Sequence, residues 1–145
     1  GKFVNNTGSS KSSIEMFDAF CKKINLDNSD IKLVDGSGVS KNNLMSADFM
    51  TAFLVDISKS PSFELYKSAM AKPGEGTLKN RMLYFSDNLR AKTGTLSDIS
   101  AIAGYITTQK GKDYAFDIMI NDAKTSNADK KLLEEYILRA IHSQY

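Results

Sequence analysis

Residues 89–121 constrain the fold more than any other part of the chain, because they have the pattern of three strands in succession. Segments 89–96 and 99–107 are rich in β-branched and small apolar residues. A third strand is indicated by apolar side chains at alternating positions, namely Tyr114, Phe116, Ile118 and Ile120. The hairpin connection 108–113 is short, and short connections join antiparallel neighbours. The sequence therefore predicts an antiparallel meander.

Helical patterns lie on both sides of these strands. Ser12 and Glu15 have the spacing of a capping box and predict the start of a first helix. Ser46 is expected to cap a second helix, and residues 63–70 have the pattern of a short third one. Ser126 is expected to cap the last helix. The predicted fold class is α+β, an antiparallel sheet flanked by helices.

The last helix carries a run of apolar side chains that we expect to face the core. They are Leu132, Leu133, Tyr136, Ile137, Ala140 and Ile141. The lone Cys21 lies in the apolar pattern of the first helix and is expected to be a buried core residue. The lone His142 lies near the end of the chain and is expected on the surface of the last helix.

Composition excludes several classes of function. A length of 145 residues suits a single domain, residues 1–145. The net charge is +2 and no basic stripe is present, so nucleic-acid binding has little support. No apolar run approaches the ~18 residues of a membrane span, so no transmembrane segment is predicted. One Cys and one His cannot build a zinc cluster, and a Ser-His-Asp triad has no obvious histidine. No metal site and no cofactor are expected.

Two short polar motifs are candidates for a functional site. Lys92, Thr93, Gly94 and Thr95 follow one another on the first predicted strand. Ser40 and Asn42 form Ser-x-Asn in a loop that contains two glycines. Alone, each motif is weak, and Lys-Thr-Gly is equally compatible with a strand end that has a glycine bulge. A fixed ammonium with neighbouring hydroxyls is, however, suited to binding a carboxylate.

Longer strings point to a family. The strings "VDGSGVSKNNL", "GEGTLKNRM" and "LRAKTGTLSDISAIAGYI" occur in this order. Together they resemble the C-terminal part of D-alanyl-D-alanine carboxypeptidases of the penicillin-binding protein 4 type, the S13 serine peptidases. The resemblance covers roughly residue 5 to the C-terminus, with Val39 where leucine is usual. It implies part of a penicillin-binding protein or β-lactamase-like domain.

The resemblance implies a role for each motif residue. Lys92 is expected to bind the terminal carboxylate of a D-Ala-D-Ala peptide or of a β-lactam, with Thr93 and Thr95 as hydroxyl donors. Gly94 leaves room for the ligand beside the strand. The backbone N–H of Thr95 is expected to supply one oxyanion donor. Ser40 would relay a proton to the leaving amine, and Asn42 would hold the substrate amide.

The nucleophile of the family, a serine in Ser-x-x-Lys at a helix start, is not recognisable in its expected place. The sequence has one literal match, Ser29 to Lys32, but it lies in a predicted loop just before Ser40. We therefore interpret the chain as the C-terminal portion of a peptidase domain that lacks the upstream Ser-x-x-Lys segment. It is expected to need the rest of its parent chain and to be inactive alone.

Three functions remain compatible with the sequence. The first is a serine-type carboxypeptidase or endopeptidase that acts on peptidoglycan stem peptides through an acyl-enzyme. The second is a non-catalytic module of the same fold that binds cell-wall peptide or protein. The third is a β-lactamase, although no Glu-containing deacylation loop is recognisable. The implied substrate places the parent protein in the periplasm or the extracellular cell envelope, although the sequence begins at Gly1 and shows no signal peptide.

Overall fold

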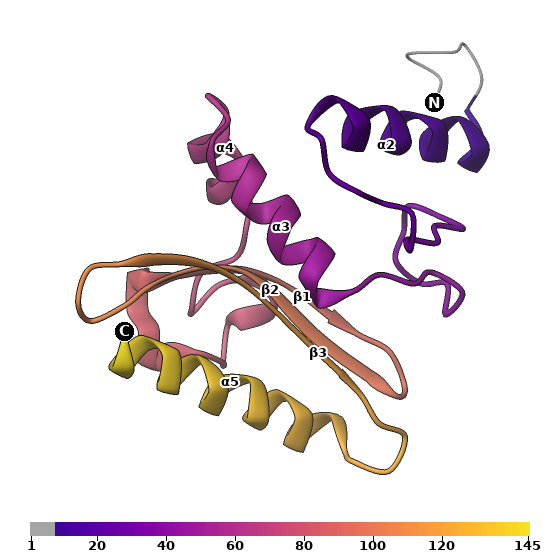
Figure 1. The fold of residues 1–145 in the computed structure, drawn as a ribbon. Coiled ribbons are helices and arrows are strands. Elements are labelled where there is room, and N and C mark those ends of the chain that lie inside the picture. Colours follow the sequence, from indigo (N-terminus) through magenta and orange to yellow (C-terminus); the bar gives the residue numbers. More distant parts are fainter. Residues whose placement is uncertain (1–7) are drawn as a thin grey trace. The chain divides into compact units, whose positions relative to one another are not determined.

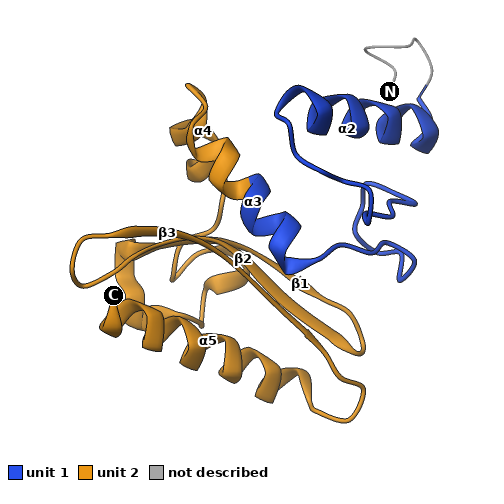
Figure 2. Cartoon of the chain, in the orientation of Figure 1, with its two compact units in different colours: residues 1–53 blue, residues 54–145 orange. Residues whose placement is uncertain are grey.

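The computed structural model describes residues 8–145. The chain divides into two compact units, residues 1–53 and 54–145, which Figure 2 shows in different colours. The elements, labelled in Figure 1, are α2 (Ser10–Lys23), α3 (Ala47–Ser58), α4 (Phe63–Ser68), η1 (Gly76–Leu78), η2 (Leu83–Asn88), β1 (Leu89–Thr95), β2 (Ile99–Thr107), β3 (Asp113–Asn121) and α5 (Asn127–Gln144). Among the described residues, no helix is long and apolar enough to cross a membrane.

The predicted meander is confirmed. The three strands form one antiparallel sheet in the order β1-β2-β3. The pairing of β1 with β2 is regular from Leu89 opposite Ile106 to Thr95 opposite Ser100. It passes through Gly94 without the glycine bulge that the motif alone could have indicated. The predicted α+β class is therefore the observed one.

Gly104 of β2 allows an unusually close approach of β1. A Cβ atom at this position would lie 2.0 Å from the carbonyl oxygen of Arg90 and 2.8 Å from the Cα of Ala91. Both atoms belong to the backbone of β1, so no side-chain rotation can relieve the overlap. Glycine is therefore required here by the path of the neighbouring strand rather than by its own dihedral angles.

The core of the second unit lies between the sheet and α5, which runs along one face of the sheet in Figure 1. Leu89 and Ala91 of β1 contribute to it, together with Leu138 of α5. Its other buried members are Leu78, Met82, Phe85, Ile102, Ile106 and Phe116. The segment between α4 and β1 thus supplies three core side chains although it has little regular secondary structure.

The predicted buried face of α5 is wrong except at Ile141, which is half-buried and packs against the core. The helix begins where predicted, since the Ser126 hydroxyl accepts a bond from the Asp129 N–H at 3.1 Å. Its buried residues, however, are Lys130, Glu134, Leu138 and His142. Leu133 and Tyr136 are 48% and 58% exposed. Three polar side chains occupy the buried face because each has a partner on the sheet or its connections, and periodicity of apolar residues cannot reveal this.

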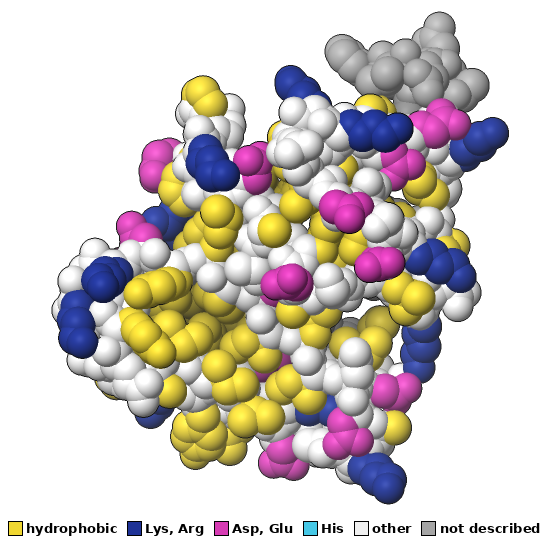
Figure 3. Space-filling view, viewed as in Figure 1, with side chains coloured by type: hydrophobic (Ala, Val, Ile, Leu, Met, Phe, Trp, Pro, Cys, Tyr) yellow, Lys and Arg dark blue, Asp and Glu magenta, His cyan; other side chains and the backbone are white. Residues whose placement is uncertain are grey.

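The prediction that His142 lies on the surface is also wrong. His142 is 5% exposed, and its Nδ1 lies 2.9 Å from the carbonyl oxygen of Thr107. Its ring packs edge-on against Phe85 and Tyr84. The displaced apolar residues of α5 remain at the surface, and Figure 3 shows hydrophobic side chains gathered over the region of β3 and α5.

The first unit has a small core of its own. Cys21 is fully buried, as predicted, and Phe17 and Phe49 are in ring contact with centroids 6.0 Å apart. Helix α2 begins earlier than predicted, because Ser9 rather than Ser12 is the N-cap and accepts a bond from the Ser12 N–H. The prediction for α3 is confirmed, because the Ser46 hydroxyl accepts from the Phe49 N–H at 3.1 Å.

Candidate functional site

The structure distributes the predicted site residues over two places. Lys92, Thr93, Gly94 and Thr95 lie together at the end of β1, in the second unit. Ser40 and Asn42 lie together in the first unit, in the loop between α2 and α3. The Ser-x-x-Lys match is not at a helix start, because Ser29 lies in a turn and its N–H donates to Asp27. The expectation that Ser29 is not the nucleophile rests on the same point, its position in a loop.

The faces of β1 separate the motif side chains into two groups. Alternation places Thr93 and Thr95 on the same face as Leu89 and Ala91, which are buried in the core beside α5. Lys92 and Gly94 belong to the opposite face. Lys92 is exposed, and its ammonium donates to the carbonyl oxygen of Thr93 at 2.5 Å. The cation is thus held close to the outer edge of the strand.

The backbone of β1 presents hydrogen-bonding groups at its outer edge. The Ala91 N–H donates across this edge to the carbonyl of Ala71 at 2.9 Å, away from β2. Because these groups alternate along an antiparallel strand, the N–H groups of Thr93 and Thr95 point to the same edge. A peptide laid along this edge would find backbone donors and acceptors at the spacing of a strand.

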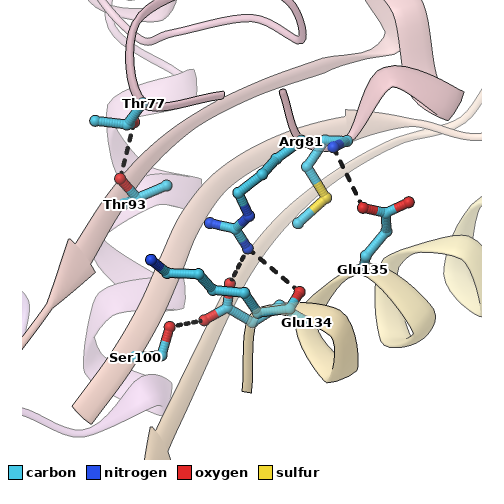
Figure 4. A network of polar contacts seen from close by, with 8 residues as sticks. Thr77, Arg81, Thr93, Ser100, Glu134 and Glu135 are labelled. Carbon is cyan, nitrogen blue, oxygen red and sulfur yellow. Dashed lines mark hydrogen bonds and ion pairs between the residues drawn. The ribbon is translucent and has the colours of Figure 1, made fainter. Parts of the chain in front are cut away.

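Residues 71–78, called the edge segment here, run along the outer side of β1. Ala71 pairs with Ala91, and the Thr77 hydroxyl lies 2.8 Å from that of Thr93. Leu78 anchors the segment because it is fully buried in the core. Figure 4 shows the Thr93 hydroxyl turned toward Thr77.

A buried ion pair supports the strands from the side of α5. Glu134 is fully buried, and its carboxylate accepts from Arg81 at 2.6 Å and from the Ser100 hydroxyl at 2.6 Å (Figure 4). Ser100 stands directly opposite Thr95 in the sheet. The same Arg81 nitrogen also donates to the carbonyl of Lys131 at 3.3 Å. The end of β1 is therefore connected to α5 through its neighbour in β2.

Sequence reasoning assigned no role to these supporting residues. Thr77 and Arg81 lie within the string "GEGTLKNRM", one of the three strings that carry the resemblance. That string could have drawn attention to them, because a threonine and an arginine in a loop-rich segment are candidates for side-chain hydrogen bonds. Nothing in the sequence pairs Arg81 with Glu134, since 53 positions separate them.

The loop that carries Ser40 and Asn42 is organised by its own polar side chains. The Asp35 carboxylate accepts from the N–H groups of Ser37 and Gly38 at 2.8 and 3.1 Å, and from the Ser37 hydroxyl at 2.8 Å. The bond from the Ser37 hydroxyl is the main reason that the pKa of Asp35 lies below its ordinary value. Carboxylate–amide bonds of this kind form Asx turns and need no tertiary contact.

Within the motif itself, the Ser40 hydroxyl accepts from the Asn42 N–H at 3.2 Å. Ser40 is half-buried and the Asn42 side chain is exposed. An accepting hydroxyl still has a proton to donate, so this bond leaves Ser40 able to act on a further group. The amide of Asn42 has two donors and one acceptor to offer a ligand.

One further carboxylate lies on the sheet face that carries Lys92. Asp117 of β3 pairs with Ala103, which in turn pairs with Lys92, so the three residues form one row across the sheet. Burial raises the pKa of Asp117 to about 6. Its Oδ2 is buried and has no hydrogen-bond partner among residues 8–145.

Comparison with known proteins identifies the family. The family model of D-Ala-D-Ala carboxypeptidase 3 (S13) matches residues 1–140. A D-alanyl-D-alanine carboxypeptidase from Actinomadura sp. is 34% identical over 106 residues, which are 68% of this chain and 20% of that protein. The carboxypeptidase DacB of Mycolicibacterium smegmatis is 32% identical over 111 residues, 70% of this chain and 24% of that protein. The chain thus spans about a fifth to a quarter of the length of these relatives.

Solved structures agree on the fold. Penicillin-binding protein 4 from Haemophilus influenzae, in complex with a β-lactam, superposes with a TM-score of 0.86 at 23% identity, over 97% of this chain and 35% of that one. A penicillin G-acylated predatory endopeptidase from Bdellovibrio bacteriovorus gives a TM-score of 0.67, also at 23% identity, over 97% of this chain and 42% of that one. With the match of the family model, these findings show that the chain belongs to the D-Ala-D-Ala carboxypeptidase 3 (S13) family.

Proposed function

We propose that this chain is the C-terminal part of the catalytic domain of a serine-type D-Ala-D-Ala carboxypeptidase or endopeptidase. The parent protein acts on peptidoglycan stem peptides in the cell envelope and is acylated by β-lactams. The observation that carries this proposal is the outer edge of β1. There the Lys92 ammonium lies at the carbonyl of Thr93, the Thr93 hydroxyl lies at Thr77, and Thr95 ends the same strand.

The proposed reaction is acyl transfer to a serine in the upstream part of the parent chain. The serine oxygen bonds to the carbonyl carbon of the penultimate D-Ala, and the bond from that carbon to the terminal D-Ala nitrogen breaks. The serine proton goes to the leaving amine, with Ser40 as the relay. Water then hydrolyses the ester and restores the serine. The acyl-enzyme divides one difficult step into two easier ones.

The strand supplies recognition and charge stabilisation to this reaction. Lys92 binds the terminal carboxylate through a charge-assisted hydrogen bond, once its ammonium leaves the carbonyl of Thr93. The N–H of Thr95 donates to the oxyanion of the tetrahedral intermediate, a type of contact worth about 3 kcal/mol. Asn42 orients the substrate amide. Without the nucleophile, these groups leave at most weak residual catalysis.

Relatives support the chemistry as well as the family. The relatives from Actinomadura sp. and Haemophilus influenzae are named D-alanyl-D-alanine carboxypeptidases, and two of the structures of similar fold hold a β-lactam or its acyl group. Substrate and acylation are transferred from these proteins to the parent of this chain. An envelope location follows from the same transfer, because peptidoglycan lies outside the cytoplasmic membrane.

Labelling with a fluorescent penicillin tests the proposal. The full-length gene product and the 145-residue chain are incubated with the reagent, and the labelled peptide is identified by mass spectrometry. We expect the full-length protein to be acylated at a serine upstream of Gly1 and the 145-residue chain to remain unlabelled. Acylation at Ser29 would contradict the assignment. Absence of acylation in both, with retained binding of D-Ala-D-Ala peptide, would instead support a non-catalytic binding module.

A further inference from the structure

The Thr77 side chain lies outside the motif and contacts the hydroxyl of Thr93. Its Oγ1 lies 2.8 Å from Oγ1 of Thr93 and accepts a hydrogen bond from the Thr93 hydroxyl. The two residues come from different elements, η1 and β1, and the contact lies at the outer edge where a ligand is expected (Figure 4). Thr77 therefore contacts β1 from the side that does not pair with β2.

The position of Thr77 is fixed by the backbone around it. Gly76 has φ = +49°, and a Cβ there would contact the Cβ of Ala71 at 3.7 Å. The Leu78 N–H donates to the carbonyl of Glu75 at 2.8 Å, and the Leu78 side chain is fully buried. A hydroxyl on so constrained a turn is held in place before any ligand arrives.

The proton count of the pair determines what Thr77 can do. Each hydroxyl has one proton, and an ionised carboxylate is an acceptor without a proton of its own. In this pair, the Thr93 hydroxyl donates to Thr77. For Thr93 to donate to a carboxylate, the hydrogen bond must reverse, so that Thr77 donates to Thr93. This reversal needs rotation of two hydroxyl protons and no movement of heavy atoms.

We propose that Thr77 is a positioning residue for recognition of the ligand carboxylate. It holds the Thr93 hydroxyl at the strand edge and, by reversing their hydrogen bond, directs the Thr93 proton to the carboxylate. This role rests on the proposed function, in which Lys92 and Thr93 bind that carboxylate together. Valine at position 77 keeps the branched shape but loses the hydroxyl, whereas serine keeps the hydroxyl.

The test compares two ligands, one with a free carboxylate and one in which that group is an uncharged methyl ester. The second-order rate of acylation of the full-length gene product is measured with penicillin G and with its methyl ester. Wild type is expected to prefer the acid. Because the hydroxyl pair is exposed to solvent, the expected effect of Thr77→Val is modest, a fall of about fivefold in the rate with the acid. The rate with the ester should stay within about twofold, and Thr77→Ser should behave like wild type with both ligands.

Several outcomes would overturn the role. Equal losses with acid and ester would show that Thr77 only maintains the fold, and no loss with either would show that it has no part in recognition. If the wild type is not acylated, binding of N-acetyl-D-Ala-D-Ala and of its C-terminal amide is compared by calorimetry in the same variants, with the same expected selectivity. Absence of both acylation and binding in the wild type would overturn the proposed function and this role with it. An acylated wild type with an unchanged acid-to-ester ratio in Thr77→Val would overturn this role alone.

Discussion

The two places that carry the motif residues are built in different ways. The loop with Ser40 and Asn42 is held by bonds between near neighbours, chiefly from Asp35 to the residues two and three positions further on. The end of β1 is held by contacts from distant positions, such as Thr77 to Thr93 and Ser100 to Glu134. A locally organised loop keeps its shape when the core is perturbed, whereas the strand end depends on the core. Stability and ligand recognition should therefore be coupled at β1 and separable at the loop.

Among the variants that test this comparison, removal of the Arg81 side chain should cause the largest loss of unfolding free energy. The variant Arg81→Met leaves the carboxylate of Glu134 buried with Ser100 as its remaining partner. Breaking a buried ion pair on one side costs about 3–5 kcal/mol of unfolding free energy. Urea unfolding of the full-length protein should show this loss, together with slower acylation by penicillin. The matched control is Lys79→Met, an exposed cation two positions away, which should leave both quantities unchanged. Equal stability of the two variants would mean that the ion pair does not support the strand.

Substitutions at Gly104 and Gly94 should affect β1 differently, the first mainly its stability and the second mainly its proposed function. In Gly104→Ala the new methyl group meets the backbone of β1, and we expect a loss of about 3 kcal/mol. In Gly94→Ala the nearest atom is Cβ of Ala101 at 3.9 Å, an ordinary contact, so stability should change by less than about 1 kcal/mol. Acylation should nevertheless fall strongly in Gly94→Ala, because the methyl group occupies the space beside the strand.

Calorimetric unfolding and penicillin labelling of the two glycine variants distinguish these effects. Retained labelling in a stable Gly94→Ala variant would show that no ligand approaches β1 at this residue. A stable Gly104→Ala variant would show that β1 and β2 can separate at little cost.

Much of the second unit was predictable because its strands alternate in a period of two and its connections are short. The second strand is predicted from Ile99 to Thr107, and β2 has these same bounds. The cap of α5 at Ser126 was likewise readable, since it depends on residues three positions apart. Local chemistry of this kind is visible in a sequence without any knowledge of tertiary contacts.

The buried face of α5 was not predictable for the opposite reason. Glu134 and His142 face the core because of partners on other elements, Ser100 and Thr107. A charged or titratable side chain is expected at the surface unless it is paired, and pairing over such separations leaves no periodic signal. The same limit applies to the candidate site. Its motif residues could be named from the sequence, whereas the contact of Thr77 with Thr93 needed the structure.

Asp117 offers a smaller test on the sheet itself, through pH. Its pKa of about 6 in the folded chain lies above the value of about 4 in an unfolded chain. The folded state therefore binds more protons between these pH values, and stability falls as pH rises from about 4 to 6. Since solvent screens part of this half-buried side chain, we expect Asp117→Asn to be more stable than wild type by about 1 kcal/mol at pH 7.

Urea unfolding at several pH values measures this difference in the full-length protein. The gain in Asp117→Asn should shrink as pH falls from 7 toward 4 and vanish below about pH 3, where the wild-type carboxyl is protonated in both states. A gain that is the same at pH 4 and pH 7 would mean that the charge of Asp117 is not the cause.

The smallest effect on stability is expected in the loop that carries Ser40 and Asn42, where stability and acylation should respond differently to a mutation. Asp35→Ala removes the acceptor of three bonds around Ser37 and Gly38 but no core contact. The midpoint of thermal unfolding should hardly change, while acylation slows because the turn at Ser37 and Gly38, which precedes Ser40 and Asn42, is no longer held. The matched control is Asp27→Ala, in which a similar turn acceptor is lost at Ser29, outside the motif.

The control variant Asp27→Ala should label like wild type, since Ser29 has no role in the proposed mechanism. A change of pH tests the same bonds without a mutation. The bonds to the Asp35 carboxylate depend on its charge, so they persist at neutral pH and weaken as pH falls through the lowered pKa of Asp35. Acylation at acid pH should therefore decline more in the wild type than in Asp35→Ala, which has already lost these bonds. A clearly lower midpoint of thermal unfolding in both Asp35→Ala and Asp27→Ala would contradict this prediction. The loop would then be coupled to the stability of its unit, as β1 is coupled to the core.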